Sequence, residues 1–387
     1  MPVYLDHAAT TPILPEALAA FTHALATVGN PSSIHSAGQR AKMLLEDGRA
    51  RVAASLDAEP VEVVFTSGGT ESVNLAVKGL FWARQVDHPR PRIVVAAGEH
   101  HATVDTVDWL ERHDGAVVDV VPLDEQGHLD LDGLEARLAS ATDVALVTFL
   151  WANNEVGTIQ PVTRIVELAH AAGVPVHADA VAAYGQVPVS FRESGLDAMS
   201  VSAHKIGGPV GIGALVLGRR ATVEPLIHGG GQQRQVRSGT QDAPAAIAFG
   251  TAASIPHADV RALRDRLVAG VLEAVPTAVL RGDPVDRLPG NAHFTFPGCE
   301  GDSLLFLLDA AGVAVSTGSA CQAGVPEASH VLLAMGLSED DARGALRVTL
   351  GHTSTDADVD AFLAALPDAV ARASAAGMAS RAPLLGR

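Results

Sequence analysis

Short apolar runs alternate with stretches of helical periodicity between about residues 60 and 220 of the chain. This alternation is typical of a mostly parallel β-sheet with helices on both faces, because each helix carries the chain back to begin the next strand in the same direction. The sequence therefore predicts an α/β fold. The predicted strands cover residues 61–66, 92–97, 117–122, 144–151, 174–178, 198–202 and 213–217, and two predicted helices cover residues 72–85 and 162–172.

The pattern changes after residue 255. A predicted helix at 260–275 precedes weaker strand signals at 292–296, 313–316 and 346–350, and a closing helix is predicted at 356–371. We interpret this part as a smaller α+β domain, since 387 residues exceed a typical single domain and two domains can share one cleft. The predicted division is a large domain at residues 15–255 and a small domain formed by residues 1–14 and 256–387.

Composition excludes several classes of protein. The formal net charge of −17 and the scattered histidines disfavour nucleic-acid binding. No apolar run reaches the ~18 residues of a membrane span, and the first 30 residues lack a basic start followed by an apolar stretch, so we expect a cytoplasmic location. Two cysteines, Cys299 and Cys321, are too few for a disulfide framework or a cysteine-based zinc site, and no metal site is predicted.

Lysine is rare, because Lys42, Lys78 and Lys205 are the only lysines among 27 basic residues. Arginine supplies most of the positive charge, but its guanidinium stays protonated and forms no imine with an aldehyde. A lysine amine can be deprotonated by its surroundings and can form one. Any of the three lysines is therefore a candidate for covalent chemistry.

Polar segments follow five of the predicted strands. Ligands of open α/β sheets bind beyond the carboxyl ends of the strands, and parallel strands place those ends at one edge. We therefore expect these segments to lie close together. They cover residues 66–72, 99–101, 153–155, 177–179 and 202–205.

The first of these segments has the features of a phosphate cup. Its two glycines, Gly68 and Gly69, allow the backbone to approach an anion, Thr70 adds a hydroxyl, and the next helix points its N-terminus inward. A turn of this kind is more often ordinary helix capping, and it lacks the Gly-Lys-Ser/Thr ending of a nucleotide-binding P-loop. Alone, it is a weak signal.

Asp179 and Lys205 strengthen the case. A cofactor with a pyridine ring needs a carboxylate that keeps the ring nitrogen protonated, and it needs a lysine. Taken singly, Asp179 fits a helix N-cap and Lys205 fits a surface lysine before a glycine-rich turn. A phosphate cup, an acid and a lysine after separate strands together favour one cofactor, pyridoxal 5'-phosphate, bound at Lys205.

The chain resembles the cysteine desulfurases of the NifS/IscS group, in the class-V aminotransferase family, over nearly its full length. This resemblance implies a fold-type I pyridoxal-phosphate enzyme that works as a homodimer. The motifs that carry it are residues 4–12, 30–33, 66–72, Glu99-His100, Asn153-Asn154-Glu155, His204-Lys205, 237–240 and 316–321.

The resemblance also implies roles for individual residues. Gly69, Thr70, Ser202 and His204 would hold the phosphate, and Thr240 would reach the partner subunit's cofactor. His100 would stack on the pyridine ring and help to move protons, Asn154 would lie by the phenolic oxygen, and Asp179 would pair with the ring nitrogen. Arg347 would grip the substrate carboxylate, a task that suits its two-pronged donor geometry, with assistance from Asn30. Taken singly, His100 also fits a satisfied loop residue and Arg347 a surface arginine.

One departure from the family pattern bears on the cofactor. The family has a glutamine three residues after the aspartate, where it donates to the phenolic oxygen, and this chain has Ala182. We predict a less strongly fixed cofactor with a shifted pKa. His7 and Ala203 also replace a commoner asparagine and glycine, and no consequence follows for either.

Cys321 decides among the reactions that pyridoxal phosphate allows. It lies among small residues, which suits an exposed loop, although a buried structural cysteine is equally compatible with the residues alone; Cys299 is interpreted as structural. The resemblance implies that L-cysteine is converted to L-alanine, leaving a persulfide on Cys321. An acceptor protein, such as an iron–sulfur scaffold or a tRNA-thiolation enzyme, would take the sulfur.

Two other functions remain open at this point. The first is another enzyme of the same fold, a selenocysteine lyase or an aminotransferase. The second is a noncatalytic sulfur carrier or scaffold that uses Cys321 without a cofactor.

Overall fold

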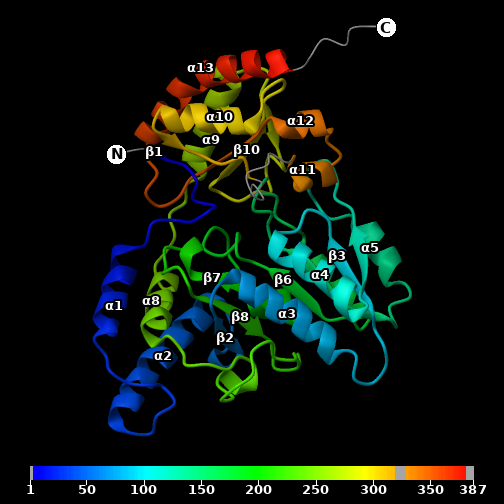
Figure 1. Cartoon of the computed structure of the whole chain (residues 1–387), viewed down its shortest axis with the longest axis vertical. Helices are drawn as coiled ribbons and strands as arrows, with labels where there is room; N and C mark the ends of the chain where they lie inside the picture. The colour runs from blue at the N-terminus through cyan, green and yellow to red at the C-terminus, as the bar shows by residue number, and fades with distance from the viewer. Residues whose placement is uncertain (1–2, 319–327, 381–387) are drawn as a thin grey trace.

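The computed structural model of the chain describes residues 3–318 and 328–380. It has two bodies, which Figure 1 shows one above the other, with a large sheet and its helices below and a smaller group of strands and helices above. None of the described helices combines the length and the apolar character that a membrane crossing requires.

Seven strands form the sheet of the larger body, and all seven lie where the sequence predicts them. One strand, β8 (Gly213–Leu217), runs antiparallel to the others. The strand order is β2 (Val63–Thr66), β8 (Gly213–Leu217), β7 (Ala198–Ser202), β6 (Val176–Asp179), β5 (Val144–Leu150), β3 (Arg92–Ala96) and β4 (Val117–Val121).

Both faces of this sheet are covered, because successive side chains of a strand point to opposite sides. Val63 and Phe65 of β2 belong to one apolar core, and Val64 between them belongs to another. The first core packs under α1 (Pro15–Leu25), α2 (Ser36–Ser55), α5 (Leu131–Leu138), α6 (Val162–Ala171) and α8 (Ala243–Ala253). The second packs under α3 (Gly69–Ala83) and α4 (His101–Asp114). A short helix, α7 (Phe191–Ser194), precedes β7.

The smaller body contains two small sheets and a core of its own, to which Leu5 near the N-terminus contributes. Its strands are β1 (Val3–Tyr4) paired with β11 (Val313–Ala314), and β12 (Ala345–Thr349), β10 (Asn291–Thr295) and β9 (Val279–Arg281) in that order. Its helices are α9 (Arg261–Ala274), α10 (Gly301–Ala310), α11 (His330–Ala334), α12 (Glu339–Arg343) and α13 (Asp356–Ser380). Separate cores support the division into residues 15–255 and residues 1–14 with 256–387, which stays a prediction.

The direction of the strands determines where the polar segments gather. β2, β3, β5, β6 and β7 all run the same way, because β2 and β7 are both antiparallel to the β8 strand between them. The segments that follow these five strands therefore lie at one edge of the sheet. That edge faces the smaller body (Figure 1).

Candidate active site

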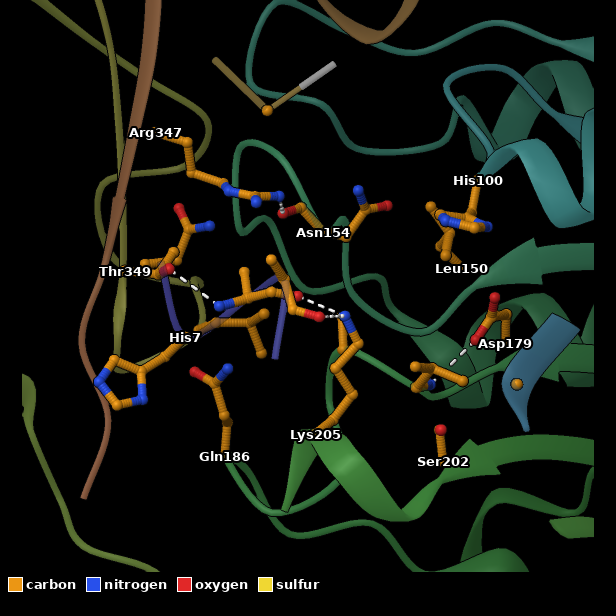
Figure 2. A pocket seen from close by; sticks show the side chains of 18 of the residues that line it. His7, His100, Leu150, Asn154, Asp179, Gln186, Ser202, Lys205, Arg347 and Thr349 are labelled. Carbon is orange, nitrogen blue, oxygen red and sulfur yellow. Dashed lines mark hydrogen bonds between the residues drawn. The ribbon is translucent and has the colours of Figure 1, made fainter. Parts of the chain in front are cut away.

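A cavity of about 430 Å³ lies at this edge, between the two bodies. Figure 2 shows side chains from distant parts of the chain pointing into it. The predicted site residues that line it are Gly69, Thr70, His100, Asn154, Asp179, Ser202, His204, Lys205 and Arg347.

Lys205 ends a single 3₁₀ turn, Ala203–Lys205, directly after β7. Its Nζ donates hydrogen bonds to the carbonyl oxygens of Ala8 and Ala9, the latter at 2.9 Å, both from the N-terminal segment. Burial, followed by the positive charge of Arg347, lowers the pKa of Lys205 to about 8. An appreciable fraction of this amine is therefore neutral near pH 7 to 8, as covalent chemistry requires. Lys205 is partly buried and lines the cavity, which favours the site over the interpretation as a surface lysine.

Asp179 is the last residue of β6 and faces the same cavity (Figure 2). Its side chain is 3% exposed, and its Oδ1 accepts a hydrogen bond from the Val181 backbone at 2.9 Å. Burial raises the pKa of Asp179 to about 6. A buried carboxylate needs a donor partner, and a protonated ring nitrogen would supply one here.

The phosphate cup forms at the start of α3. Gly69 and Thr70 are its first two residues, and Gly69 packs so closely against Val181 that an added Cβ would lie 2.8 Å from Val181 Cγ2. Ser202 contributes a buried hydroxyl that has no hydrogen-bond partner among the described residues. His204 Nδ1 lies 3.2 Å from Thr10 Oγ1. An unpartnered buried hydroxyl beside a helix N-terminus fits a bound phosphate.

His100 is the N-cap of α4 and also lines the cavity. Its Nδ1 accepts a hydrogen bond from the Ala102 backbone at 3.0 Å. Withdrawal from water in the cavity, followed by the charge of Lys205, lowers the pKa of His100 to about 4. The ring is therefore neutral near pH 7, and because Nδ1 is the acceptor, the proton is on Nε2. His100 therefore fits both interpretations: it is a hydrogen-bonded residue that caps a helix, and it also faces the site.

Glu99 is a buried acid that the sequence analysis did not assign to the site. It is 2% exposed, and its Oε1 accepts a hydrogen bond from the Leu150 backbone at 2.7 Å. Burial, followed by the charge of Asp179, raises the pKa of Glu99 to about 8. Glu99 is thus mostly protonated near pH 7, which leaves Asp179 as the anionic member of this pair.

Arg347 lies on β12 of the smaller body and is 5% exposed, so the interpretation as a surface arginine is wrong. One terminal nitrogen donates to the Asn154 carbonyl at 2.9 Å, and the other donates to the Asp6 carboxylate at 2.9 Å. Its Nε is buried and has no partner among the described residues. Since a guanidinium has five N–H donors, this one retains capacity for a carboxylate ligand.

The remaining predicted residues lie in different places. Ala182 lines the cavity, and its methyl side chain offers no hydrogen-bond donor there. Asn30 and Thr240 are exposed and do not line the cavity of their own chain, so their roles stay predictions. Cys321 lies outside the described residues. Cys299 is 4% exposed and burial raises its thiol pKa, in agreement with a structural cysteine.

Other groups of the site have only weak sequence signals. Asp6 pairs with Arg347, which is 341 positions away in the chain. Gln186 and Asn291 line the cavity with His7, and no local pattern marks them. Within residues 3–318 and 328–380, no group of three or more His, Cys, Asp or Glu side chains could hold a metal ion.

Comparisons with known proteins extend over nearly the whole chain. Residues 3–362 match the family model described as aminotransferase class-V. A relative named IscS-like cysteine desulfurase, from Mycobacterium tuberculosis, is 54% identical over 387 residues, which cover 97% of this chain and 98% of the relative.

Solved structures are similar as well. A NifS-like protein has a TM-score of 0.88 at 34% identity and covers 96% of this chain and 100% of its own. A structure described as SspA in complex with cysteine has a TM-score of 0.80 at 31% identity. The match covers 90% of this chain and 98% of that structure's chain. The expected fold-type I architecture is confirmed, and enzymes of this family depend in general on pyridoxal phosphate. The chain therefore belongs to the class-V aminotransferase family, in its group of NifS- and IscS-like cysteine desulfurases.

Proposed function

We propose that the chain is a cysteine desulfurase that uses pyridoxal phosphate to convert L-cysteine to L-alanine and transfers the sulfur to Cys321. The observation that carries the proposal is the Lys205 amine, which has a pKa of about 8 and shares a cavity with the buried Asp179 and Arg347. The similarity to proteins named cysteine desulfurase supports the substrate.

Pyridoxal phosphate fits the residues that line the cavity. Gly69, Thr70, Ser202 and His204 would hold its phosphate, Asp179 its ring nitrogen, and Lys205 its aldehyde carbon. His100 and Asn154 would contact its ring. When bound, it would supply an electron sink for the charge left on the substrate Cα after proton removal.

Three residues of the chain would bind the substrate and move its proton. Arg347 would bind the carboxylate of L-cysteine through its free N–H donors, with Asn30 assisting. The Lys205 amine, once released, would take the proton from Cα. His100 would pass protons through Nε2, because its Nδ1 is held by the Ala102 backbone.

Sulfur transfer would take place at Cys321. Its thiolate attacks the substrate sulfur, an S–S bond forms, and the Cβ–S bond breaks with its electron pair going to Cβ. That carbon takes up a proton on the way to L-alanine. The net change is L-cysteine plus one protein thiol giving L-alanine plus one protein persulfide.

Further parts of the proposal concern partners. The working unit would be a homodimer in which Thr240 reaches the partner subunit's cofactor. The persulfide would pass to an iron–sulfur scaffold or a tRNA-thiolation enzyme. The cytoplasmic location expected from composition stays a prediction.

Mass spectrometry of the purified holoprotein after incubation with L-cysteine tests the function. We expect one added sulfur atom on Cys321 and formation of alanine. Cys321→Ser should retain the yellow cofactor and lose both products. If the protein were an aminotransferase, Cys321→Ser would leave its activity unchanged. If it were a noncatalytic scaffold, the purified protein would have no yellow chromophore. Either result would overturn the proposal.

A further inference from the structure

The Lys205 amine is bound by a turn of the N-terminal segment. Within the described residues its Nζ donates hydrogen bonds to the carbonyl oxygens of Ala8 and Ala9, and Figure 2 draws them as dashed lines. Both acceptors lie in one turn, in which the Ala9 N–H donates to the Asp6 carbonyl at 3.0 Å. A turn that is about 196 positions away in the chain therefore fixes the position of the amine.

Tyr4 holds this turn through its side chain. The Tyr4 hydroxyl donates to the Thr10 carbonyl at 2.8 Å and lies 3.0 Å from the Asp6 carbonyl. Asp6 and Thr10 stand on the two sides of the residues that bind Lys205, so one hydroxyl contacts both ends of the turn. The Tyr4 backbone belongs to β1, which pairs with β11 of the smaller body. The position of the two carbonyls thus depends on the Tyr4 side chain.

Further hydrogen bonds join the turn to both bodies. The Ala8 N–H donates at 2.9 Å to Oγ1 of Thr349, which lies on β12 of the smaller body. The Thr11 N–H donates at 3.2 Å to the carbonyl of His204, in the 3₁₀ turn that ends at Lys205. The N-terminal turn therefore contacts the element that carries the lysine.

Carbonyl oxygens suit an amine that has to lose and regain a proton. A hydrogen bond to the charged form of a group favours that form, so the carbonyls of Ala8 and Ala9 oppose the burial that lowers the Lys205 pKa. A carboxylate paired directly with the amine would raise the pKa further, because it carries a full charge. The two carbonyls can therefore orient the amine and leave its pKa near neutral pH.

Charged and titratable side chains on several elements also act on Lys205. Arg347 lowers its pKa, and the carboxylates of Asp6 and Asp179 raise it. The amine in turn lowers the pKa of His100 and of His204, each of which burial already lowers. A test of the turn therefore has to retain all of these side chains.

We propose that Tyr4 is a positioning residue for the catalytic lysine. Its hydroxyl holds the turn of residues 6–10, and this turn binds the free amine of Lys205 through two backbone carbonyls. The inference rests on the proposed function, because the amine is free at the step in which it takes the proton from Cα. It assigns Tyr4 no contact with the cofactor or the substrate.

The chain has two tyrosines, which provide a matched pair of variants. Tyr4→Phe removes the hydroxyl that holds the turn. Tyr184→Phe removes a hydroxyl that lies 2.5 Å from Ser55 Oγ, and Tyr184 does not line the cavity. Tyr184 is the more buried of the two, at 4% exposed, so the control should lower Tm at least as much. Thr349→Val loosens the turn independently, because it removes the acceptor of the Ala8 N–H.

The rarity of lysine makes the Lys205 pKa directly measurable. The whole chain, labelled with ¹³C at lysine Cε and freed of cofactor, should give three lysine signals by NMR, and Lys205→Arg identifies one of them. The wild type should titrate at about 8 at Lys205. We expect Tyr4→Phe and Thr349→Val to lower this pKa by about 0.5 to 1, because weakened hydrogen bonds stabilise the ammonium less. Tyr184→Phe should leave it within about 0.2 of the wild type.

Proton exchange tests the same residue in the holoenzyme. L-alanine is the product of the proposed reaction, so exchange of its Cα proton with D₂O reverses the last proton transfer. We expect Tyr4→Phe to slow this exchange about threefold to tenfold at saturating L-alanine, because a small misplacement of a base is costly. The affinity for L-alanine, measured by cofactor absorbance, should stay within about twofold. Tyr184→Phe should keep both quantities within about twofold of the wild type.

The two measurements fail in different ways. An unchanged or raised Lys205 pKa in Tyr4→Phe, or an equal effect of Tyr184→Phe, would overturn the inference. The NMR titration needs neither cofactor nor substrate, so such a result would leave the proposed function intact. A wild-type holoenzyme that exchanges no Cα proton of L-alanine would instead overturn the role of Lys205 in the proposed function.

Discussion

The rarity of lysine made the central residue of the site predictable from sequence. Of three lysines, only Lys205 lines the cavity, and Lys78 lies instead over the ring of Trp109 at 4.1 Å from its centroid. The Asp6–Arg347 pair was not predictable in the same way. Its members are 341 positions apart, and only the folded chain brings them together.

Asp179 should destabilise the cofactor-free protein at neutral pH. Its pKa is raised from 3.8 to about 6, so the folded state binds more protons than the unfolded state between these values. The stability that this group contributes is full below pH ~4 and is lost as pH rises through 6, a loss of about 3 kcal/mol.

Asp179→Asn removes this dependence. Urea denaturation of the cofactor-free variant should give a higher free energy of unfolding than the wild type at pH 8, with the difference shrinking toward pH 4. Asp143→Asn is the control of opposite sign, because a hydrogen bond from Arg92 lowers the Asp143 pKa. A pH-independent difference for Asp179→Asn would contradict the assignment of a buried, reluctantly ionised carboxyl.

Ala182, in place of the glutamine of the family, should lower the affinity of the protein for pyridoxal phosphate. Because it lines the cavity, Ala182→Gln would place an amide donor there. One added hydrogen bond of about 0.5–1.5 kcal/mol should raise the affinity for pyridoxal phosphate about two- to tenfold and shift the pH titration of its absorbance. Ala182→Met, of similar length without a donor, is the control. Equal behaviour of the two variants would show that the missing glutamine has no consequence.

At the scale of elements, apolar periodicity predicted the sheet well and the ends of elements less well. All seven predicted strands are present, but β2 begins at Val63 instead of residue 61 because Pro60–Glu62 form a 3₁₀ turn. The helix α13 continues to Ser380 instead of ending at residue 371. Its last part is rich in alanine, which favours helix without the amphipathic pattern on which the prediction depended.

The N-terminus of α3 should act as the phosphate site. Gly69→Ala would bring its Cβ within 2.8 Å of Val181 Cγ2 and shift the backbone N–H groups of the cup. We expect about a tenfold loss of affinity for pyridoxal phosphate, measured by absorbance titration.

Val181 offers a rescue for this change. The double variant Gly69→Ala with Val181→Ala removes the methyl group that the new Cβ meets, and it should recover most of the lost affinity. Loss in the single variant without recovery in the double would indicate a disrupted fold rather than a distorted cup.

At the scale of the whole molecule, the position of Thr240 makes a dimer testable. Thr240 is exposed and lies outside the cavity of its own chain, as expected if it serves the partner's site. Thr240→Ala and Lys205→Ala should each be inactive as pure proteins.

Mixing these two variants should restore activity. In a mixed dimer, one site combines Lys205 of the first chain with Thr240 of the second, so refolded equimolar mixtures should regain about a quarter of wild-type activity by random pairing. No recovery, with mixed dimers present by native mass spectrometry, would count against a shared site.

The central claim is that Lys205 carries the cofactor in this cavity, and borohydride reduction followed by peptide mapping tests it most directly. The account predicts one pyridoxyl group, on the peptide that contains Lys205. An adduct on Lys42 or Lys78, or no adduct at all, would contradict it.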